Sequence, residues 1–181
     1  MLFQSSRIYL RKMTEDDISI YHKWRSDVEV MATTSPHLEA VTFEDTKHFV
    51  EQVILGSHSS KSYIIVDKES QAPIGVTSLI QIDNKNRNAE CILDIGEKEF
   101  WGKGYGTEAL RMLLDYAFLE LNLHRVSLCV FSFNTKAVKL YEKLGFQREG
   151  VLRQALFRAG EWHDILQMGM LQAEYGKTPH V

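Results

Sequence analysis

Three glycines, Gly102, Gly104 and Gly106, alternate over five residues of this chain, between a strand-like run and a strongly amphipathic helical pattern. Glycine lets successive backbone N–H groups turn toward one point, and it leaves room for a ligand where other residues carry a Cβ. The start of the following helix adds free N–H groups and the positive end of its dipole. A simple strand-to-helix turn needs fewer glycines. The spacing therefore predicts a loop that binds a phosphate or pyrophosphate through the backbone N–H groups of residues 102–107.

Three classes of phosphate ligand compete for such a loop. A P-loop requires Gly-x-x-x-x-Gly-Lys-Ser/Thr, but here Lys103 lies between glycines and no Ser or Thr follows it directly. A dinucleotide-binding fold requires Gly-x-Gly-x-x-Gly early in a βαβ unit, whereas here the third glycine falls one residue early and three strand-like runs precede the loop. The third class is coenzyme A, whose pyrophosphate would lie on the loop while its pantetheine arm follows the preceding strand.

Two carboxylates share one face of the strand predicted before the loop. Successive side chains of a strand alternate between its faces, so one face is apolar and the other carries Glu90, Ile92 and Asp94; the apolar face consists of Ala89, Cys91, Leu93 and Ile95. The carboxylates are either solvated surface groups or acceptors for the proton of a substrate ammonium group. Asp94 lies about 13 Å beyond Glu90 at roughly 3.3 Å per residue, so we do not expect one group to replace the other.

A second helical pattern is opened by Asn134 and closed by Gly145, and it carries Tyr141 on its apolar side. Asn is a favoured N-cap, which by itself accounts for Asn134. Tyr141 is either a core residue or a proton donor. A buried tyrosine hydroxyl needs a partner, and an ordinary pKa of about 10 leaves it protonated at neutral pH.

The elements that position these residues follow from hydrophobic periodicity. The longest stripe predicts a buried helix after the glycines, with Leu110, Leu113, Leu114, Ala117, Phe118 and Leu121 inward. Strands are predicted over residues 8–12, 62–67, 73–82, 88–95, 125–131, 149–157 and 162–171. The resulting order is β-α-α-β-β-β-α-β-α-β-β, a mixed sheet with helices packed on it, in a single domain of residues 1–181.

Two of the predicted helices lie between the first two strands, with Thr14 and Thr42 as their caps. The buried side of the first is predicted to carry Ile18, Tyr21, Trp24 and Val28. The second is predicted to end near Leu55, and residues 31–40 between the two helices are predicted to be irregular.

Several segments resemble the GNAT acyltransferase superfamily. The loop Trp101-Gly102-Lys103-Gly104-Tyr105-Gly106 is similar to the family's Gln/Arg-x-x-Gly-x-Gly/Ala, with the glycines matched and Trp101 in place of the polar first residue. Residues 134–146 are similar to Asn-x-x-Ala-x-x-x-Tyr-x-x-x-Gly-Phe. Ala89-Glu90, residues 149–153 and residues 160–164 resemble the RimJ/RimL-type branch, which includes ribosomal-protein N-terminal and polyamine acetyltransferases. The resemblance covers nearly the whole chain.

The resemblance implies a GNAT-like α/β (α+β mixed) domain, with a mixed, mostly antiparallel central sheet flanked by helices, and acetyl-CoA as co-substrate. It implies a set of cofactor-binding residues: Leu93, Ile95, Gly102, Lys103, Gly104, Tyr105, Gly106, Thr107, Asn134, Lys136 and Lys143. It further implies that Tyr141 protonates the departing thiolate. Glu90 would take the proton of the amine, directly or through water, and the acetyl group would pass directly to the amine.

The acceptor amine stays open at this point. The segment from Asp27 to Asp45 carries five carboxylates, which suits a cationic amine and a solvated surface equally. The branch resemblance favours a protein N-terminus or a polyamine, or another small amine, without separating them. The alternative function is a non-catalytic domain that binds acyl-CoA as a sensor or interaction module.

Composition and residue patterns limit the classes of partner and the cellular location that we expect. A net charge of −3 at pH 7 gives no sign of nucleic-acid binding. No apolar run approaches the roughly 20 residues of a membrane span, and no signal-peptide pattern begins the chain. Cys91 and Cys129 are predicted core residues without a disulfide framework, which fits the cytoplasm. The histidines lack the spacing of metal ligands, so no metal is expected. Homodimers are common in the family that the chain resembles, so a homodimer is a possible assembly.

Overall fold

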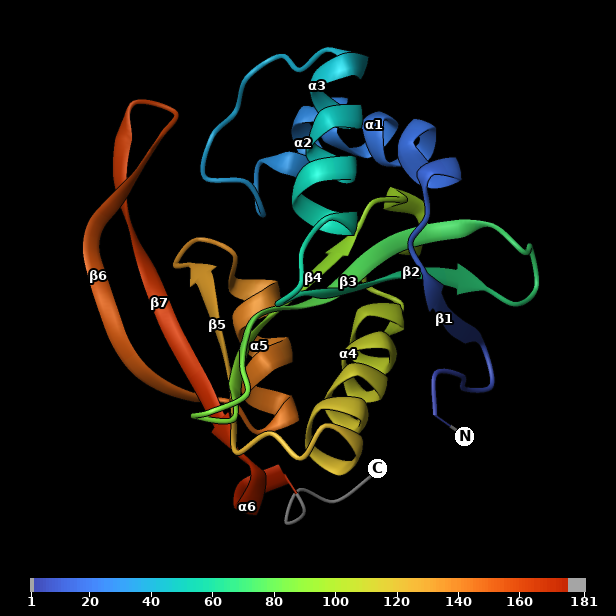
Figure 1. Cartoon of the computed structure of the whole chain (residues 1–181). Coiled ribbons are helices and arrows are strands. Elements are labelled where there is room, and N and C mark those ends of the chain that lie inside the picture. Colours follow the sequence, from blue (N-terminus) through green and yellow to red (C-terminus); the bar gives the residue numbers. More distant parts are fainter. Residues whose placement is uncertain (1, 176–181) are drawn as a thin grey trace.

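Seven strands form one mixed sheet through the middle of the molecule (Figure 1). The computed structural model describes residues 2–175, so residue 1 and residues 176–181 of the predicted domain lie outside the described residues. The strands are β1 (Ile8–Lys12), β2 (Lys61–Asp67), β3 (Pro73–Asp83), β4 (Asn88–Ile95), β5 (Arg125–Phe131), β6 (Gln147–Arg158) and β7 (Glu161–Leu171). Their order is β1-β2-β3-β4-β5-β7-β6, and only β4 and β5 are parallel. The predicted mixed, mostly antiparallel α/β sheet is confirmed.

Helices cover both faces of this sheet (Figure 1). One side carries α1 (Ile18–Ser26), α2 (Val28–Met31) and α3 (Phe43–Phe49), the other carries α4 (Tyr105–Asp115) and α5 (Thr135–Leu144), and α6 (Gln172–Tyr175) follows β7. Short 3-10 turns cover Glu15–Asp17 and Lys98–Phe100, and π-helical turns, Val50–Leu55 and Tyr116–Glu120, extend α3 and α4. In the part of the chain that the structure describes, no helix is long and apolar enough to cross a membrane.

Local hydrogen bonds set the ends of two predicted helices. Thr42 Oγ1 accepts from the N–H of Asp45 at 3.0 Å, and the Asp45 carboxylate accepts from the N–H of Thr42 at 2.9 Å. Asn134 Oδ1 accepts from the N–H of Ala137 at 3.2 Å at the start of α5, and Gly145 ends that helix with a φ of 103°. These caps are confirmed because each needs only residues close in the sequence.

The first predicted helix is interrupted at Asp27. This residue is extended, with φ −88° and ψ 108°, and its carboxylate accepts from the N–H groups of Glu29 at 3.0 Å and Val30 at 3.3 Å, so it caps α2 as a new helix. Val28 is 68% exposed, whereas Val30 is buried. The prediction that Val28 lies on the buried side is wrong, because helical periodicity holds only along an unbroken helix.

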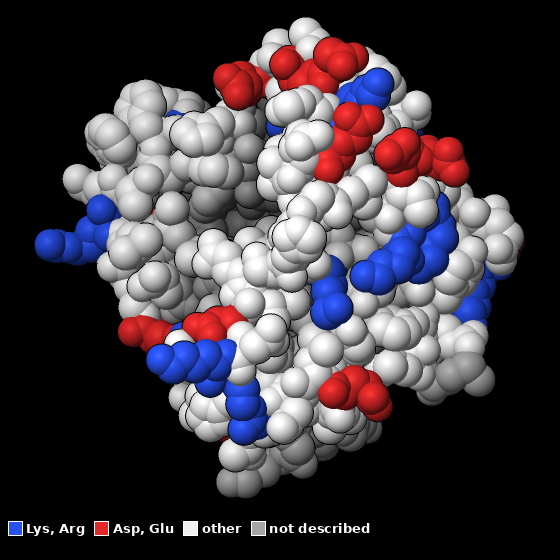
Figure 2. All heavy atoms as spheres, viewed as in Figure 1, with Lys and Arg blue, Asp and Glu red and all other residues white. Residues whose placement is uncertain are grey.

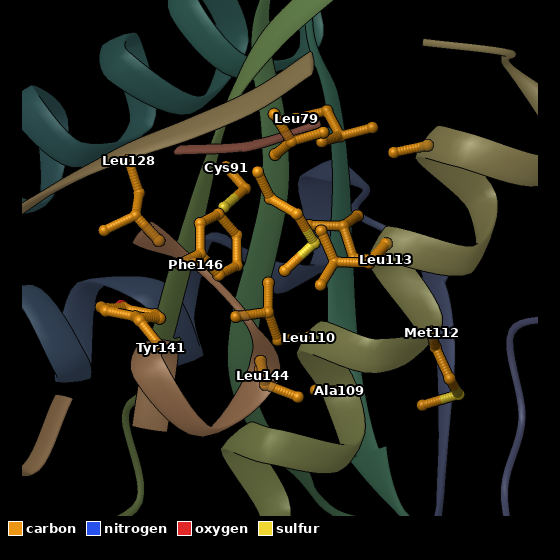
Figure 3. Close-up of a cluster of buried hydrophobic side chains, with 14 of the residues drawn as sticks. Leu79, Cys91, Ala109, Leu110, Met112, Leu113, Leu128, Tyr141, Leu144 and Phe146 are labelled. Atoms are coloured by element: carbon orange, nitrogen blue, oxygen red, sulfur yellow. The ribbon is translucent and has the colours of Figure 1, made fainter. Parts of the chain in front are cut away.

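The larger core fixes α4 on the sheet. Leu110 and Leu113 of α4 are fully buried against residues that include Leu79 of β3 and Leu128 of β5 (Figure 3). Burying a leucine side chain contributes about 1.5–3 kcal/mol. The predicted stripe is confirmed, and its burial also holds in place the glycine loop at the start of α4.

Strands β4 and β5 pair only at their first residues. Asn88, Ala89 and Glu90 pair with residues 125–127, after which β4 pairs with β3 alone and β5 with β7 alone. Backbone N–H and C=O groups inside proteins normally find partners. The edge of β4 beyond Glu90 therefore faces an opening in the sheet where an extended ligand can supply amide groups of its own.

The β6–β7 hairpin stands beside the layer of α1–α3, and Figure 2 shows the surface hollowed between them. Arg158, at the end of β6, donates to the backbone carbonyl of Ser35 at 2.7 Å and to that of Ala32. This bridge joins the end of the hairpin to the segment after α2, so that both border the hollow.

Candidate active site

The glycine loop presents free backbone N–H groups at the start of α4. Gly102 and Gly104 have φ values of 71° and 86°, a left-handed conformation that strains residues with a Cβ. The N–H groups of Gly102, Lys103 and Gly104 have no acceptor within residues 2–175. The first turn of a helix leaves further N–H groups free, here at residues 105–107. Together these groups form a site suited to an anion.

Trp101 fastens this loop to the end of β4. Its Nε1 donates to the carbonyl oxygen of Ile95 at 2.7 Å. Trp101 replaces the polar first residue of the family's motif, and this hydrogen bond gives it a structural role in the loop.

Arg7 braces the loop from the other side. It donates from Nη1 to the carbonyl of Lys103 at 3.0 Å and from Nε to the Glu108 carboxylate at 2.8 Å. Its guanidinium lies 4.4 Å from the centroid of the Tyr105 ring, and the Tyr105 hydroxyl donates to Asp67 at 3.4 Å. The Tyr105 side chain thus supports the loop, and only its backbone is available to a ligand.

Gly106 lets α4 approach β4 closely. A Cβ at this position would lie 3.2 Å from Leu93 Cδ2 and 3.7 Å from Ile95 Cγ1. The side chains of Leu93 and Ile95 thus lie under α4, and the backbone of these residues faces the opening beside β4. Their role in cofactor binding stays a prediction, and it concerns backbone groups.

Asn134 uses both polar atoms of its side chain within the protein. Besides capping α5, its Nδ2 donates to the carbonyl of Thr33 at 3.4 Å. Capping and this bridge account for Asn134, so its contact with a cofactor stays a prediction.

Four other predicted cofactor residues offer free groups near the loop or along α5. Lys103, Lys136 and Lys143 are exposed, and Thr107 is half-buried. None of the three ammonium groups forms an ion pair within the described residues. They are available to an anionic ligand, and their roles stay predictions.

Tyr141 of α5 is a buried residue of the core whose hydroxyl is not fully enclosed. Its ring contacts Phe146, with centroids 5.9 Å apart, and both rings lie together in Figure 3. Burial raises the pKa of Tyr141, and Cys91 and Asp94 add to this rise. Its hydroxyl has no hydrogen-bond partner in the described part of the chain. A protonated hydroxyl without a structural partner fits a proton donor better than a core residue.

Glu90 and Asp94 lie on the face of β4 toward α1–α3, because Ala89 and Cys91 fill the core on the opposite face. Both carboxylates are half-buried, and neither has a hydrogen-bond donor or a cationic partner among residues 2–175. Desolvation raises the pKa of Glu90, and it raises the pKa of Asp94 to about 6. Desolvating an anion without a partner is costly, so this face of β4 is suited to a cationic ligand.

The two carboxylates have different neighbours. The charge of Asp94 adds to the raised pKa values of Tyr141 and of Tyr21 on α1, where desolvation raises the pKa to about 12. The charge of Glu90 instead adds to the pKa values of the Cys91 and Cys129 thiols, which desolvation raises most.

The prediction of a buried Cys129 is wrong. It is exposed, because it alternates along β5 with the buried Leu128 and Val130.

The acidic segment that begins at Asp27 is partly neutralised within the protein. Lys98 Nζ lies 2.8 Å from the Asp27 carboxylate and 2.9 Å from that of Glu29. Glu39 and Glu44 are exposed and have no ion pair in the described residues. Less charge is therefore available to a cationic acceptor than the sequence implies.

Residues 7–147 match the family described as acetyltransferase (GNAT) domain. The chain belongs to this family. It is 34% identical over 173 residues to the N-acetyltransferase p20 of Bacillus licheniformis, covering 94% of this chain and 96% of that protein. It is 30% identical over 173 residues to the spermidine N(1)-acetyltransferase of Vibrio cholerae, covering 94% and 96%.

A solved structure extends this relation to three dimensions. The crystal structure of spermidine N-acetyltransferase from Vibrio cholerae in complex with CoA and spermine matches with a TM-score of 0.86 at 29% identity, over 96% of this chain and 100% of that chain. The GNAT resemblance is confirmed, and the chain is an acetyl-CoA-dependent N-acetyltransferase. Among the described residues, no group of three or more His, Cys, Asp or Glu side chains is placed to hold a metal ion.

The geometry of the glycine loop and of the neighbouring strand β4 is suited to acetyl-CoA. Free N–H groups of residues 102–104 suit a pyrophosphate, and the unpaired edge of β4 suits the amides of a pantetheine arm. Sequence reasoning missed Arg7, which lies 96 residues before the Lys103 carbonyl that it holds. No local pattern carries such a signal.

Proposed function

We propose that this N-acetyltransferase acetylates a small polycationic amine of the polyamine class. The observation behind this is the pair Glu90 and Asp94, two desolvated carboxylates without a cation in the described protein. They lie about 13 Å apart along the strand, so an amine with more than one ammonium group can neutralise both. The spermine in the Vibrio cholerae structure supports a polyamine over a protein N-terminus.

The reaction is a direct transfer. Residues 102–107 hold the pyrophosphate of acetyl-CoA, and the edge of β4 aligns its thioester with the amine. A carboxylate removes one proton from the ammonium group, for which the family resemblance predicts Glu90. The nitrogen lone pair then attacks the thioester carbonyl carbon. Tyr141 protonates the sulfur as the carbon–sulfur bond breaks.

An amine-panel assay tests this function. Thiol release from acetyl-CoA is measured with spermidine, spermine, an aminoglycoside and a peptide with a free N-terminus. We expect the highest kcat/KM with a polyamine, and none with the Gly104→Val variant, whose loop cannot admit the co-substrate. A preference for the peptide would contradict the acceptor class. Acetyl-CoA binding without turnover of any amine would favour the sensor function.

Two further predictions accompany this function. The two free cysteines are consistent with action in the cytoplasm, which fractionation of cells would check. A homodimer is expected because dimers are common in the family, and sedimentation velocity would measure the oligomeric state.

A further inference from the structure

Helix α2 is a single turn that depends on contacts at its two ends. It has four residues, Val28–Met31, and a helix of this length is not stable by its own hydrogen bonds. Only Val30 of this turn is buried. Its N-terminus is fixed by Asp27, which accepts from the N–H groups of Glu29 and Val30. Lys98 pairs with the same Asp27 carboxylate at 2.8 Å.

The C-terminal end of α2 is capped by a side chain from a distant part of the sequence. Carbonyl groups in the last turn of a helix have no partner within it, and they carry the negative end of its dipole. Arg158, at the end of β6, supplies the missing donors. Its Nη1 donates to the carbonyl of Ala32, the residue that ends α2, and its Nη2 donates to that of Ser35 at 2.7 Å. One planar guanidinium thus binds two carbonyls, a geometry that a lysine ammonium does not reproduce.

Two further contacts join the segment of residues 32–35 to its surroundings. Asn134, the N-cap of α5, donates from Nδ2 to the carbonyl of Thr33 at 3.4 Å. The Arg158 guanidinium lies 5.9 Å from the centroid of the Phe131 ring, at the end of β5. Three of the four carbonyls of residues 32–35 therefore accept from side chains of β6 and α5. These contacts fix the segment relative to the hairpin and to the start of α5.

We propose that Arg158 is a positioning residue for the acceptor amine. Residues 32–35 and the β6–β7 hairpin both border the hollow beside α1–α3 (Figure 2). Glu90 and Asp94, the carboxylates proposed to meet a polyamine, lie on this side of the sheet. Arg158 holds this wall of the hollow in place relative to α5, whose Tyr141 is the proposed proton donor. The role rests on the proposed function, because the wall matters to catalysis only when an amine enters the hollow.

Loss of Arg158 should act on the acceptor and not on the co-substrate. A wall that is in place in only a fraction of the molecules lowers the apparent affinity for the amine by that fraction. The acetyl-CoA site lies at the start of α4 and on the edge of β4. Within the described residues, the hydrogen bonds of Arg158 go to neither element. We therefore expect a higher KM for the amine at an unchanged affinity for acetyl-CoA.

The charge of Arg158 would have the opposite effect. A cation beside a site for a polycationic amine repels it, so removal of the charge alone would lower KM. The sign of the change in KM therefore separates positioning of the wall from simple repulsion of the amine.

Steady-state kinetics with spermidine and acetyl-CoA test the assignment on three variants. Arg158→Met removes the donors but keeps a long side chain, and Arg158→Lys keeps the charge without the planar fork. The matched control Arg153→Met removes an exposed arginine of the same strand, which forms no hydrogen bond or ion pair with the described residues.

We expect Arg158→Met to raise KM for spermidine roughly tenfold, the equivalent of one hydrogen bond from a charged donor, with a smaller change in kcat. Arg158→Lys should recover part of this loss, and Arg153→Met should match the wild type. Calorimetry should give the same acetyl-CoA Kd for all four proteins.

Hydrogen exchange adds a readout that does not depend on turnover. The N–H groups of Ala32 and Ser35 donate to carbonyls of α2, so they should exchange faster in Arg158→Met, while α4 keeps its protection. An unchanged or lower KM for spermidine, an equal loss of acetyl-CoA affinity, or unchanged exchange at these two residues would overturn the assignment. If the wild type acetylates no amine of the panel, the proposed function fails, and the exchange measurement still decides whether Arg158 fastens the segment.

Discussion

Replacing Asp94 with asparagine should stabilise the protein at neutral pH. The substitution keeps the size and shape of the side chain and removes only its charge. In the folded protein the pKa of Asp94 is about 6, against an ordinary value of 3.8. The folded state therefore holds a proton that the unfolded chain releases, and stability falls as pH rises from about 4 to about 6.

The magnitude follows from the difference between the two pKa values. Each pH unit between them corresponds to ~1.4 kcal/mol. Because the side chain is only half-buried, the charged carboxylate lowers the free energy of unfolding by at most about 3 kcal/mol above pH 7. Asparagine does not ionise and avoids this loss. Below pH 4 the protonated carboxyl and the amide are both neutral polar groups without a partner, so the two proteins should be nearly equal there.

Urea denaturation at pH 4 and pH 7.5, followed by circular dichroism, measures this difference. Midpoints and slopes of the variant and the wild type give the free energies of unfolding at each pH. We expect Asp94→Asn to gain up to about 3 kcal/mol at pH 7.5 and close to nothing at pH 4. Glu120→Gln, which removes a carboxylate at an exposed position outside the site, is the matched control, and its effect should be small at both values. An equal gain at both pH values, or a loss at pH 7.5, would refute the reasoning that this carboxylate is desolvated and unpartnered.

Three other substitutions test the remaining parts of the site. Tyr141→Phe should lower kcat by roughly 10²–10⁴-fold with unchanged acetyl-CoA affinity; wild-type turnover would make the tyrosine a core residue only. Gly104→Val should abolish most acetyl-CoA binding in calorimetry, because a β-branched residue is strained at a φ of 86°, and unchanged affinity would remove the loop from the cofactor site. Trp101→Phe should weaken acetyl-CoA binding about fivefold, the equivalent of ~1 kcal/mol for the lost hydrogen bond to Ile95; an unaltered Kd would show that the bond does not shape the loop.

The site illustrates how far local patterns reach. The alternating glycines, the caps at Thr42 and Asn134 and the shared face of Glu90 and Asp94 could all be predicted, because each depends on neighbours a few residues away. The surroundings of Asp94 could not be predicted, because Tyr21 and Tyr141, whose raised pKa values its charge adds to, come from helices on opposite sides of the sheet.

The amino-acid sequence by itself determined the order of the strands, the glycine loop and the buried stripe of α4, because backbone preferences and side-chain periodicity act over short stretches. Only the tertiary structure decided that Val28 is exposed, that Lys98 neutralises Asp27, and that Arg7 holds the loop. It alone decided where β4 and β5 separate and leave an edge of β4 open. These features arise from contacts between residues tens of positions apart, and the packing of whole elements sets such contacts.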